Sequence, residues 1–256
     1  MVTGSILRHT LRMDEPLAPV RSSALTRATD GRSGSTFLDP RAWRDAITLQ
    51  AAPAWAVIGF CITASVLGVL NAMRGGVPWD WGLSAQALAE GRWYALVAHM
   101  FAHAGPWHLY LNATFLLGVT PVVMARFGLG PSGWLRFAIL FLVSGLLGAA
   151  LYLALHPAGV VPMVGASGAI CGLWGAATRF DPEDGMAALT SARVRDQVMA
   201  FAKMNVILFL ILFALVWLSG GVGGLAWEAH LGGFLFGLLV GPRLASRTVP
   251  AAFAAG

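Results

Sequence analysis

The sequence is poor in charge. Only 11% of its 256 residues are Asp, Glu, Lys or Arg, whereas 57% are hydrophobic and the mean hydropathy is +0.70. A soluble domain normally carries about twice that charged fraction. The apolar residues form long charge-free blocks and do not recur at a spacing of 3.6, which is typical of helices surrounded by lipid. The composition therefore argues against a soluble domain and predicts an all-α, polytopic membrane protein.

Cysteine is scarce as well. Cys61 and Cys171 both fall inside apolar blocks, so we expect no disulfide, and neither residue indicates a redox compartment. We also expect no cleavable secretory signal, because the first apolar block lies far from the N-terminus.

Five charge-free blocks predict the membrane helices. They cover residues 46–73, 93–125, 137–178, 204–227 and 229–242. At about 20 residues per crossing, the longest block accommodates two helices. The six expected helices lie near 54–73, 107–126, 136–155, 167–179, 200–219 and 228–245. We therefore expect one six-helix membrane domain.

The predicted domain organisation has three parts. The membrane domain covers 46–247. It follows a polar, arginine-rich arm at 1–45 that we expect to be disordered, and it precedes a short tail at 248–256. The loop at 219–226, rich in glycine, is a candidate lid.

The few basic residues are unevenly distributed. With the N-terminus in the cytoplasm, fifteen of the seventeen Lys and Arg residues lie on the inner side, and only Arg74 and Arg92 lie outside. The positive-inside rule favours this orientation, with arm and tail both cytoplasmic. The net charge of +5 then indicates contact with an anionic inner leaflet, and we expect no nucleic-acid partner.

Polar residues within the apolar blocks converge on one depth. Counting 1.5 Å per residue from the inner boundary places Ser167, His230 and Asn112 about 12, 10 and 9 Å below the outer face. His108 lies one turn above Asn112. Polar groups are costly at that depth and tend to mark function. The second, fourth and sixth helices are therefore expected to place polar side chains at one common depth in the membrane.

The fourth helix is too short to cross a membrane alone, because Arg179 follows Ser167 by only twelve positions. The preceding segment contains Pro157, Pro162 and Gly165, which predict irregular backbone. Such backbone is tolerated at membrane depth only against protein or a wet cavity. We therefore expect Ser167 at a helix N-terminus, on the floor of a cavity open to the outside, where unpaired N–H groups favour negative charge.

Glycines predict close packing of the fourth and sixth helices. Gly168 lies on the fourth helix, and Gly233 and Gly237 form a small-xxx-small pattern on the sixth. His230 shares the face of these glycines, so close packing brings its imidazole to Ser167. A glycine pattern by itself more often marks packing than chemistry. Here packing and chemistry agree. A serine is a poor nucleophile until a base takes its proton, and close packing brings that base to Ser167.

Three motifs together resemble the rhomboid intramembrane serine proteases. They are HAGPWHLYLN at 103–112, GASG at 165–168 and AHLGGFLFG at 229–237. The resemblance covers about residues 54–245, and the three motifs also have the order and spacing of that family. A six-helix core without a seventh helix resembles the prokaryotic form.

The resemblance implies a role for each site residue. Ser167 would be the nucleophile and His230 the general base and later the acid. His108, Asn112 and the Ser167 amide would stabilise the oxyanion, a task in which one donor is typically worth about 10²–10³ in rate. The supporting glycines would be Gly165, Gly168, Gly233 and Gly237.

The function implied is that of a serine endopeptidase that cleaves transmembrane segments of other membrane proteins. We expect it in a bacterial inner membrane, with its active site opening to the periplasmic side. We expect no cofactor and no metal, and the sequence indicates no oligomeric state.

Two groups near the site suggest other chemistry. His99 and His103 are four residues apart, as in half of a zinc site, but the metalloprotease motif needs Glu directly after the first His. This chain has Met100 there. Glu228 is the nearest acid to His230, yet it is two residues away and on another helix face. We therefore expect a Ser–His dyad.

Two other functions stay open. A non-proteolytic binding protein or chaperone of transmembrane helices on the same fold would be expected to lack Ser167 or His230, and both are present. A transporter would need carboxylates within its spans, and one Glu at a loop edge is little support.

Overall fold

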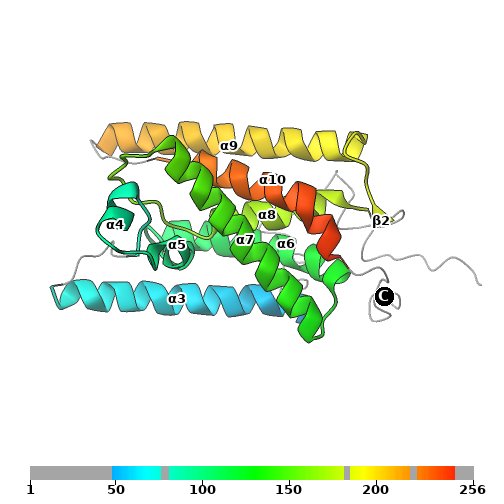
Figure 1. Ribbon diagram of the computed structural model, residues 1–256, viewed down its shortest axis with the longest axis horizontal. Coiled ribbons are helices and arrows are strands. Elements are labelled where there is room, and N and C mark those ends of the chain that lie inside the picture. The colour runs from blue at the N-terminus through cyan, green and yellow to red at the C-terminus, as the bar shows by residue number, and fades with distance from the viewer. Residues whose placement is uncertain (1–47, 76–80, 182–184, 220–223, 246–256) are drawn as a thin grey trace, which may run out of the picture.

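A computed structural model describes most of the chain and is largely helical (Figure 1). The described residues are 48–75, 81–181, 185–219 and 224–245. The predicted arm at 1–45 and tail at 248–256 lie outside them, as do positions 220–223 of the candidate lid.

Six helices of thirteen or more residues make up most of the described chain. They are α3 (Ala52–Met73), α6 (Pro106–Phe127), α7 (Pro131–Leu155), α8 (Ser167–Arg179), α9 (Ala192–Ser219) and α10 (Trp227–Leu244). The shorter elements are η1 (Leu49–Ala51), α4 (Ala85–Ala89), α5 (Ala95–Ala98), η2 (His99–Phe101) and the antiparallel pair β1 (Phe180–Asp181) and β2 (Gly185–Met186).

The predicted helices are all present, and their starts differ most for α7 and α9. The expected starts were 136 and 200, whereas the helices begin at Pro131 and Ala192. Charged residues ended the apolar blocks, but they do not end a helix. Pro131 opens α7 because its missing N–H and fixed φ suit the first helical position.

Four helical segments are long and apolar enough to cross a membrane. They are Leu49–Met73, Pro106–Phe127, Pro131–Leu155 and Ala192–Leu218. The short α8 is not among them, and neither is α10, whose 18 residues include Glu228, His230 and Arg243. These helices fit a multi-pass membrane protein, and the crossing of the membrane by all six helices stays a prediction.

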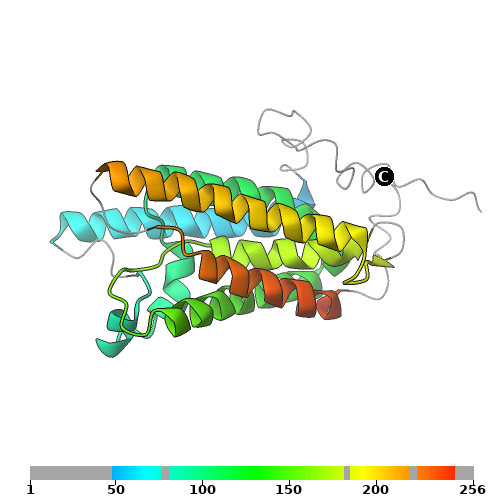
Figure 2. The same cartoon turned by 90° about the horizontal axis from the view of Figure 1, so that it is seen from above.

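The centre of the bundle is α8, which contacts α6, α7 and α10 (Figure 2). Most of its residues are buried. Against α10 the contact is backbone to backbone. A methyl group on Gly233 would overlap the Gly168 carbonyl, and one on Gly237 would overlap the Gly172 carbonyl. The predicted close packing of these two helices is confirmed.

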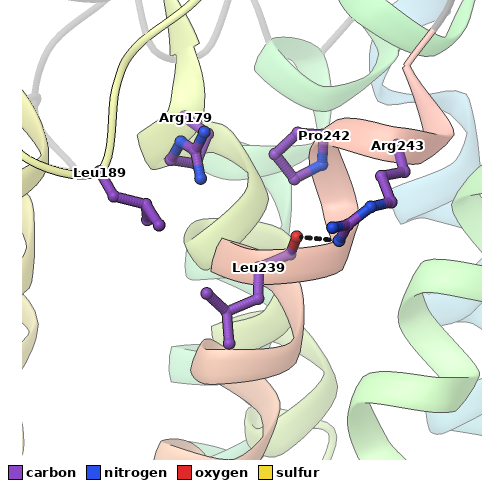
Figure 3. A pocket seen from close by; sticks show the side chains of 5 residues that line it. All are labelled: Arg179, Leu189, Leu239, Pro242 and Arg243. Atoms are coloured by element: carbon purple, nitrogen blue, oxygen red, sulfur yellow. Dashed lines mark hydrogen bonds between the residues drawn. The ribbon is translucent and has the colours of Figure 1, made fainter.

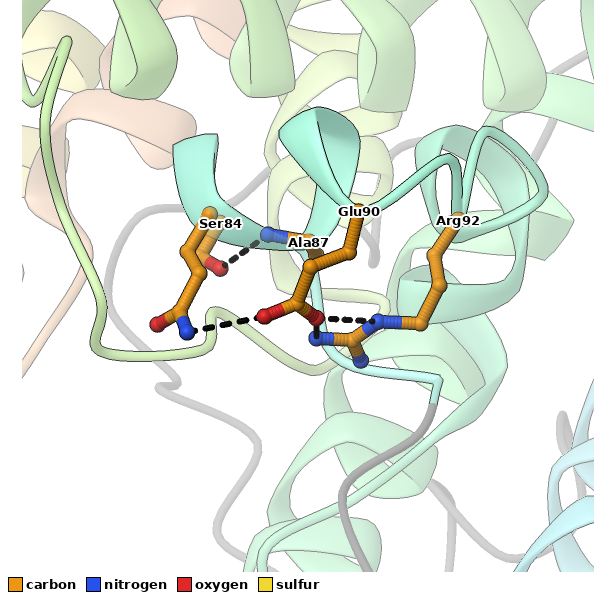
Figure 4. Close-up of polar contacts among 5 residues, drawn as sticks. Ser84, Ala87, Glu90 and Arg92 are labelled. Carbon is orange, nitrogen blue, oxygen red and sulfur yellow. Dashed lines mark hydrogen bonds and ion pairs between the residues drawn. The ribbon is translucent and has the colours of Figure 1, made fainter.

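Residues 81–105, which precede α6, form a small subdomain at one end of the bundle. The Ser84 hydroxyl caps α4 by accepting a hydrogen bond from the Ala87 N–H at 3.0 Å (Figure 4). The Glu90 carboxylate accepts hydrogen bonds from Arg92 and Gln86, both at 2.8 Å. These bonds hold the pKa of the Glu90 carboxyl below its ordinary value.

Candidate functional site

The loop before α8 is tied to the subdomain at two points. Leu83 and Met163 exchange backbone hydrogen bonds of 2.9 and 2.8 Å. The Gly165 N–H then donates to the His99 carbonyl at 2.8 Å. These bonds satisfy irregular backbone as it enters the bundle, and α8 begins at Ser167, as predicted.

Gly165 is required by both conformation and space. Its φ of +117° lies in a region that residues with a side chain rarely adopt. A Cβ at this position would also stand 2.8 Å from Cε1 and from Nε2 of His108. The absence of a side chain therefore lets the His108 ring lie directly against the loop that carries Ser167.

The structure brings Ser167 and His230 together. The hydroxyl oxygen of Ser167, half-buried at the first position of α8, lies 2.7 Å from Nε2 of His230. His230 is buried in the first turns of α10. A distance of 2.7 Å allows the serine O–H to donate to the imidazole if Nε2 carries no proton.

A third side chain reaches His230 from α9. The amide oxygen of Asn205 lies 2.6 Å from Nδ1 of His230, on the far side of the ring from Ser167. The sequence alone did not indicate a role for Asn205. Asn205 stands in the apolar stretch MNVILF, and nothing in its spacing indicates a partner on α10. Its only sequence signal is an amide in a stretch otherwise suited to lipid.

His108 and Asn112 lie one turn apart on α6, beside the loop. The Ala104 N–H donates to Nδ1 of His108 at 3.3 Å, so the ring proton resides on Nε2, next to Gly165. The Asn112 amide nitrogen donates one hydrogen to the His108 carbonyl at 2.9 Å. Its second hydrogen is available for another acceptor. Two N–H groups from α6 therefore stand on one side of the loop.

Residues 90–247, more than half of the chain, match the Rhomboid domain. The chain belongs to the rhomboid family. The matched segment includes Ser167, His230, His108 and Asn112, and it also includes Asn205. The match begins after α3, whereas the resemblance expected from the motifs began at about residue 54.

A plant relative gives a second, more distant likeness. This rhomboid is 28% identical over 160 residues to RHOMBOID-like protein 5 of Arabidopsis thaliana. The aligned part covers 62% of this chain and 46% of the relative. The chain thus spans about half the length of this relative.

Glu228 is turned away from the site in this rhomboid. Its carboxylate lies 2.9 Å from Nε2 of His156, the residue that follows α7, and Glu228 itself is buried. The prediction that Glu228 does not orient His230 agrees with this contact. The expected site contained only Ser167 and His230. In the structure Asn205 lies beside Nδ1 of His230, where a triad would have an acid.

The other two histidines near the loop serve the packing of this end. Nδ1 of His99 lies 2.9 Å from the Ala95 carbonyl. The ring of His103 packs edge-on against His108, with centroids 5.1 Å apart. Among the described residues, no group of three His, Cys, Asp or Glu side chains is placed to hold a metal ion.

Proposed function

We propose that this rhomboid is an intramembrane serine endopeptidase with Ser167 as its nucleophile and His230 as its base. The observation that carries the proposal is the 2.7 Å distance between the Ser167 hydroxyl and Nε2 of His230. Both residues lie on helices whose backbones touch, so the pair is held by rigid elements.

The reaction proceeds by acyl transfer. Nε2 of His230 takes the proton as the Ser167 oxygen adds to the carbonyl carbon of the scissile peptide. The resulting oxyanion accepts hydrogen bonds from the Ser167 N–H, from Nε2–H of His108 and from the Asn112 amide. The imidazolium then gives its proton to the leaving amine, and an ester remains on Ser167. Water, deprotonated by His230, hydrolyses that ester and restores the serine.

The proposed substrates are transmembrane segments of other membrane proteins. The peptide must leave its helical form to present a carbonyl to Ser167, so helix-breaking residues near the cut and a small residue before it are expected. We place the N-terminus in the cytoplasm and the six helices across a bacterial inner membrane. The site then opens to the periplasmic side through a water-accessible cavity. The opposite end of the helix bundle then lies at the anionic inner leaflet.

The test uses purified protein, a fluorophosphonate probe and a fluorescent reporter with one transmembrane segment. Wild-type protein should react with the probe and cleave the reporter. Ser167→Ala and His230→Ala should abolish cleavage, and Ser167→Ala should also abolish labelling. Ser144→Ala is the matched control, because Ser144 is buried on α7 and its change leaves the Ser167–His230 contact intact.

Two results would contradict the proposal. Labelling that survives Ser167→Ala would place the nucleophile elsewhere. Wild-type protein that binds the reporter but neither cleaves it nor reacts with the probe would favour the non-proteolytic binding protein.

A further inference from the structure

Asn205 presents a defined atom to His230. Its amide nitrogen donates to the Phe201 carbonyl, one turn back on α9, at 2.9 Å. That bond fixes which end of the amide is nitrogen, so the atom 2.6 Å from Nδ1 of His230 is the oxygen. An amide oxygen only accepts hydrogen bonds.

From this contact we infer that Asn205 is a positioning residue that sets the tautomer of His230. The inference rests on the proposed function. Nδ1 must carry the ring proton to donate to the Asn205 oxygen. In the neutral ring, Nε2 then holds the lone pair that faces the Ser167 hydroxyl. The opposite tautomer would lose the bond to Asn205 and direct an N–H at the nucleophile.

A pair of aromatic rings keeps Asn205 in register with His230. Phe201 precedes Asn205 by one turn on α9, and Phe234 follows His230 by one turn on α10. Their rings stack with centroids 4.0 Å apart and planes 15° apart. Because α9 and α10 run in opposite directions, this stack lies one turn from the Asn205–His230 bond on both helices. The stack therefore limits how far α9 can rotate or slide at that bond.

A neutral partner suits this depth. The nearby carboxylate of Glu228 is engaged by His156, at the end of α7. A buried carboxylate without full compensation is expensive in a medium of low dielectric constant, whereas an amide orients the ring without adding charge. Asn205 thus performs the orienting part of the role that an acid has in a triad.

The experiment reads the tautomer directly. Protein with ¹⁵N-labelled histidine is examined by NMR, and the His230 signals are assigned by their loss in His230→Ala. Wild-type protein should show the proton on Nδ1. Asn205→Leu, of similar size but apolar, should give a mixture of tautomers. Its kcat for the reporter should fall by at least about tenfold with KM unchanged, because the wrong tautomer cannot act as base.

Gln197→Leu is the matched control. Gln197 also lies on α9 and accepts a 3.0 Å hydrogen bond from the Trp174 indole of α8, so its loss loosens α9 without touching His230. It should leave tautomer and kcat unchanged. Equal losses of kcat in the two variants, or an Asn205→Leu protein that keeps the Nδ1 proton, would overturn the inference. If wild-type protein cleaves nothing, the proposed function fails, and the NMR result still decides the role of Asn205.

A second inference concerns the other end of the bundle. A groove of about 600 Å³ lies at the C-terminal ends of α8 and α10 (Figure 3). It is lined by Arg179, Leu189, Leu239, Pro242 and Arg243. The groove therefore combines two cationic side chains with apolar ones, far along α8 from Ser167.

Both guanidinium groups are held by backbone carbonyls. Arg179 donates to the carbonyls of Ala187 at 2.7 Å and Leu238 at 3.3 Å, and Arg243 donates to Leu239 at 2.8 Å. In the part of the chain that the structure describes, no carboxylate lies within ion-pair distance of either arginine. Each guanidinium retains N–H donors beyond these bonds, and its planar fork suits a phosphate.

The geometry points to a site for the phosphate of an anionic phospholipid. Leu189 and Leu239 are about half exposed, at 49% and 50%, and would contact the first carbons of the acyl chains. This occupant places charge against both arginines and apolar chain against both leucines at once. A free anion would satisfy only the arginines.

Native mass spectrometry of detergent-purified protein, mixed with equal phosphatidylglycerol and phosphatidylcholine, tests this site. Wild-type protein should retain phosphatidylglycerol preferentially, and Arg243→Gln should reduce the retained fraction severalfold. Arg195→Gln is the control of equal charge change, because Arg195 is 73% exposed and does not line the groove. Equal effects of the two variants would indicate general surface charge and overturn the site. Displacement of the lipid by millimolar inorganic phosphate would indicate a site for free phosphate instead.

Discussion

The helices that approach Ser167 do so in two different ways. Between α8 and α10 the backbones touch where Gly233 meets Gly168 and Gly237 meets Gly172, because these glycines place no side chain between the helices. Between α9 and the same pair, the contact is made by side chains, chiefly the Phe201–Phe234 stack and the Asn205–His230 bond. Only 11% of the apolar window of α9 is buried, against 39% for α7.

The two kinds of contact hold different residues of the proposed site. Ser167 and His230, the proposed nucleophile and base, lie on the two helices whose backbones touch. Asn205, the proposed positioning residue of His230, lies on α9, and most of the apolar window of α9 is not buried. A small displacement of α9 would break the Asn205–His230 hydrogen bond, whereas α10 has no room to move towards α8.

The largest effect is expected from filling the glycine contact. Gly237→Val places a branched side chain where the Gly172 carbonyl already lies, so we expect the free energy of unfolding to fall by about 3 kcal/mol, the upper end for overpacked cores. Thermal melting in detergent measures this. Gly118→Val is the control, since nothing lies within 4 Å of a Cβ there. Equal melting temperatures for the two variants would show that α8 and α10 are not in backbone contact.

The next largest effect is expected on cleavage activity, from a change where the loop before α8 contacts α6. Gly165→Ala must displace the His108 ring and adopt an unfavourable φ, so we expect reporter cleavage to fall by about 10²-fold, the cost of a misplaced catalytic group. Kinetics beside a melting curve check this. An alanine variant with wild-type kcat would argue against His108 as an oxyanion donor.

A smaller effect is expected from loosening α9. Phe201→Leu keeps the core apolar but removes the ring stack on Phe234, which should cost about 1 kcal/mol. Hydrogen exchange along α9 should increase while α8 and α10 stay protected. If exchange rises equally in all three helices, α9 is not the separately attached element that the comparison describes.

The smallest effect lies outside all three helices, at Glu90. Its pKa is lowered in the folded protein, chiefly by the hydrogen bond from Arg92, so its stabilising contribution is present above the ordinary value of 4.5 and is lost as the pH falls below it. Melting temperatures from pH 7 to pH 3 should therefore decline slightly less in Glu90→Gln than in wild-type protein. Identical declines would show that this exposed contact contributes nothing measurable.

The helices and the place of Ser167 at the start of α8 were predictable because their signals are local. Charge-free blocks mark the apolar helices, and proline and glycine before Ser167 interrupt the backbone where α8 begins. The glycines on α8 and α10 also predicted their contact, since small residues in helical register permit close approach. The starts of α7 and α9 were misplaced most, because a helix continues past the charges that end an apolar block.

The partner of His230 was not predictable in the same way. By itself the sequence determined which helices form, where Ser167 lies on α8 and which glycines allow α10 to approach it. Only the tertiary structure decided that Asn205 meets His230 and that Glu228 meets His156. The physical reason is rotation: an apolar helix such as α9 has no polar face to fix its orientation about its own axis, so which of its side chains faces α10 is decided by packing.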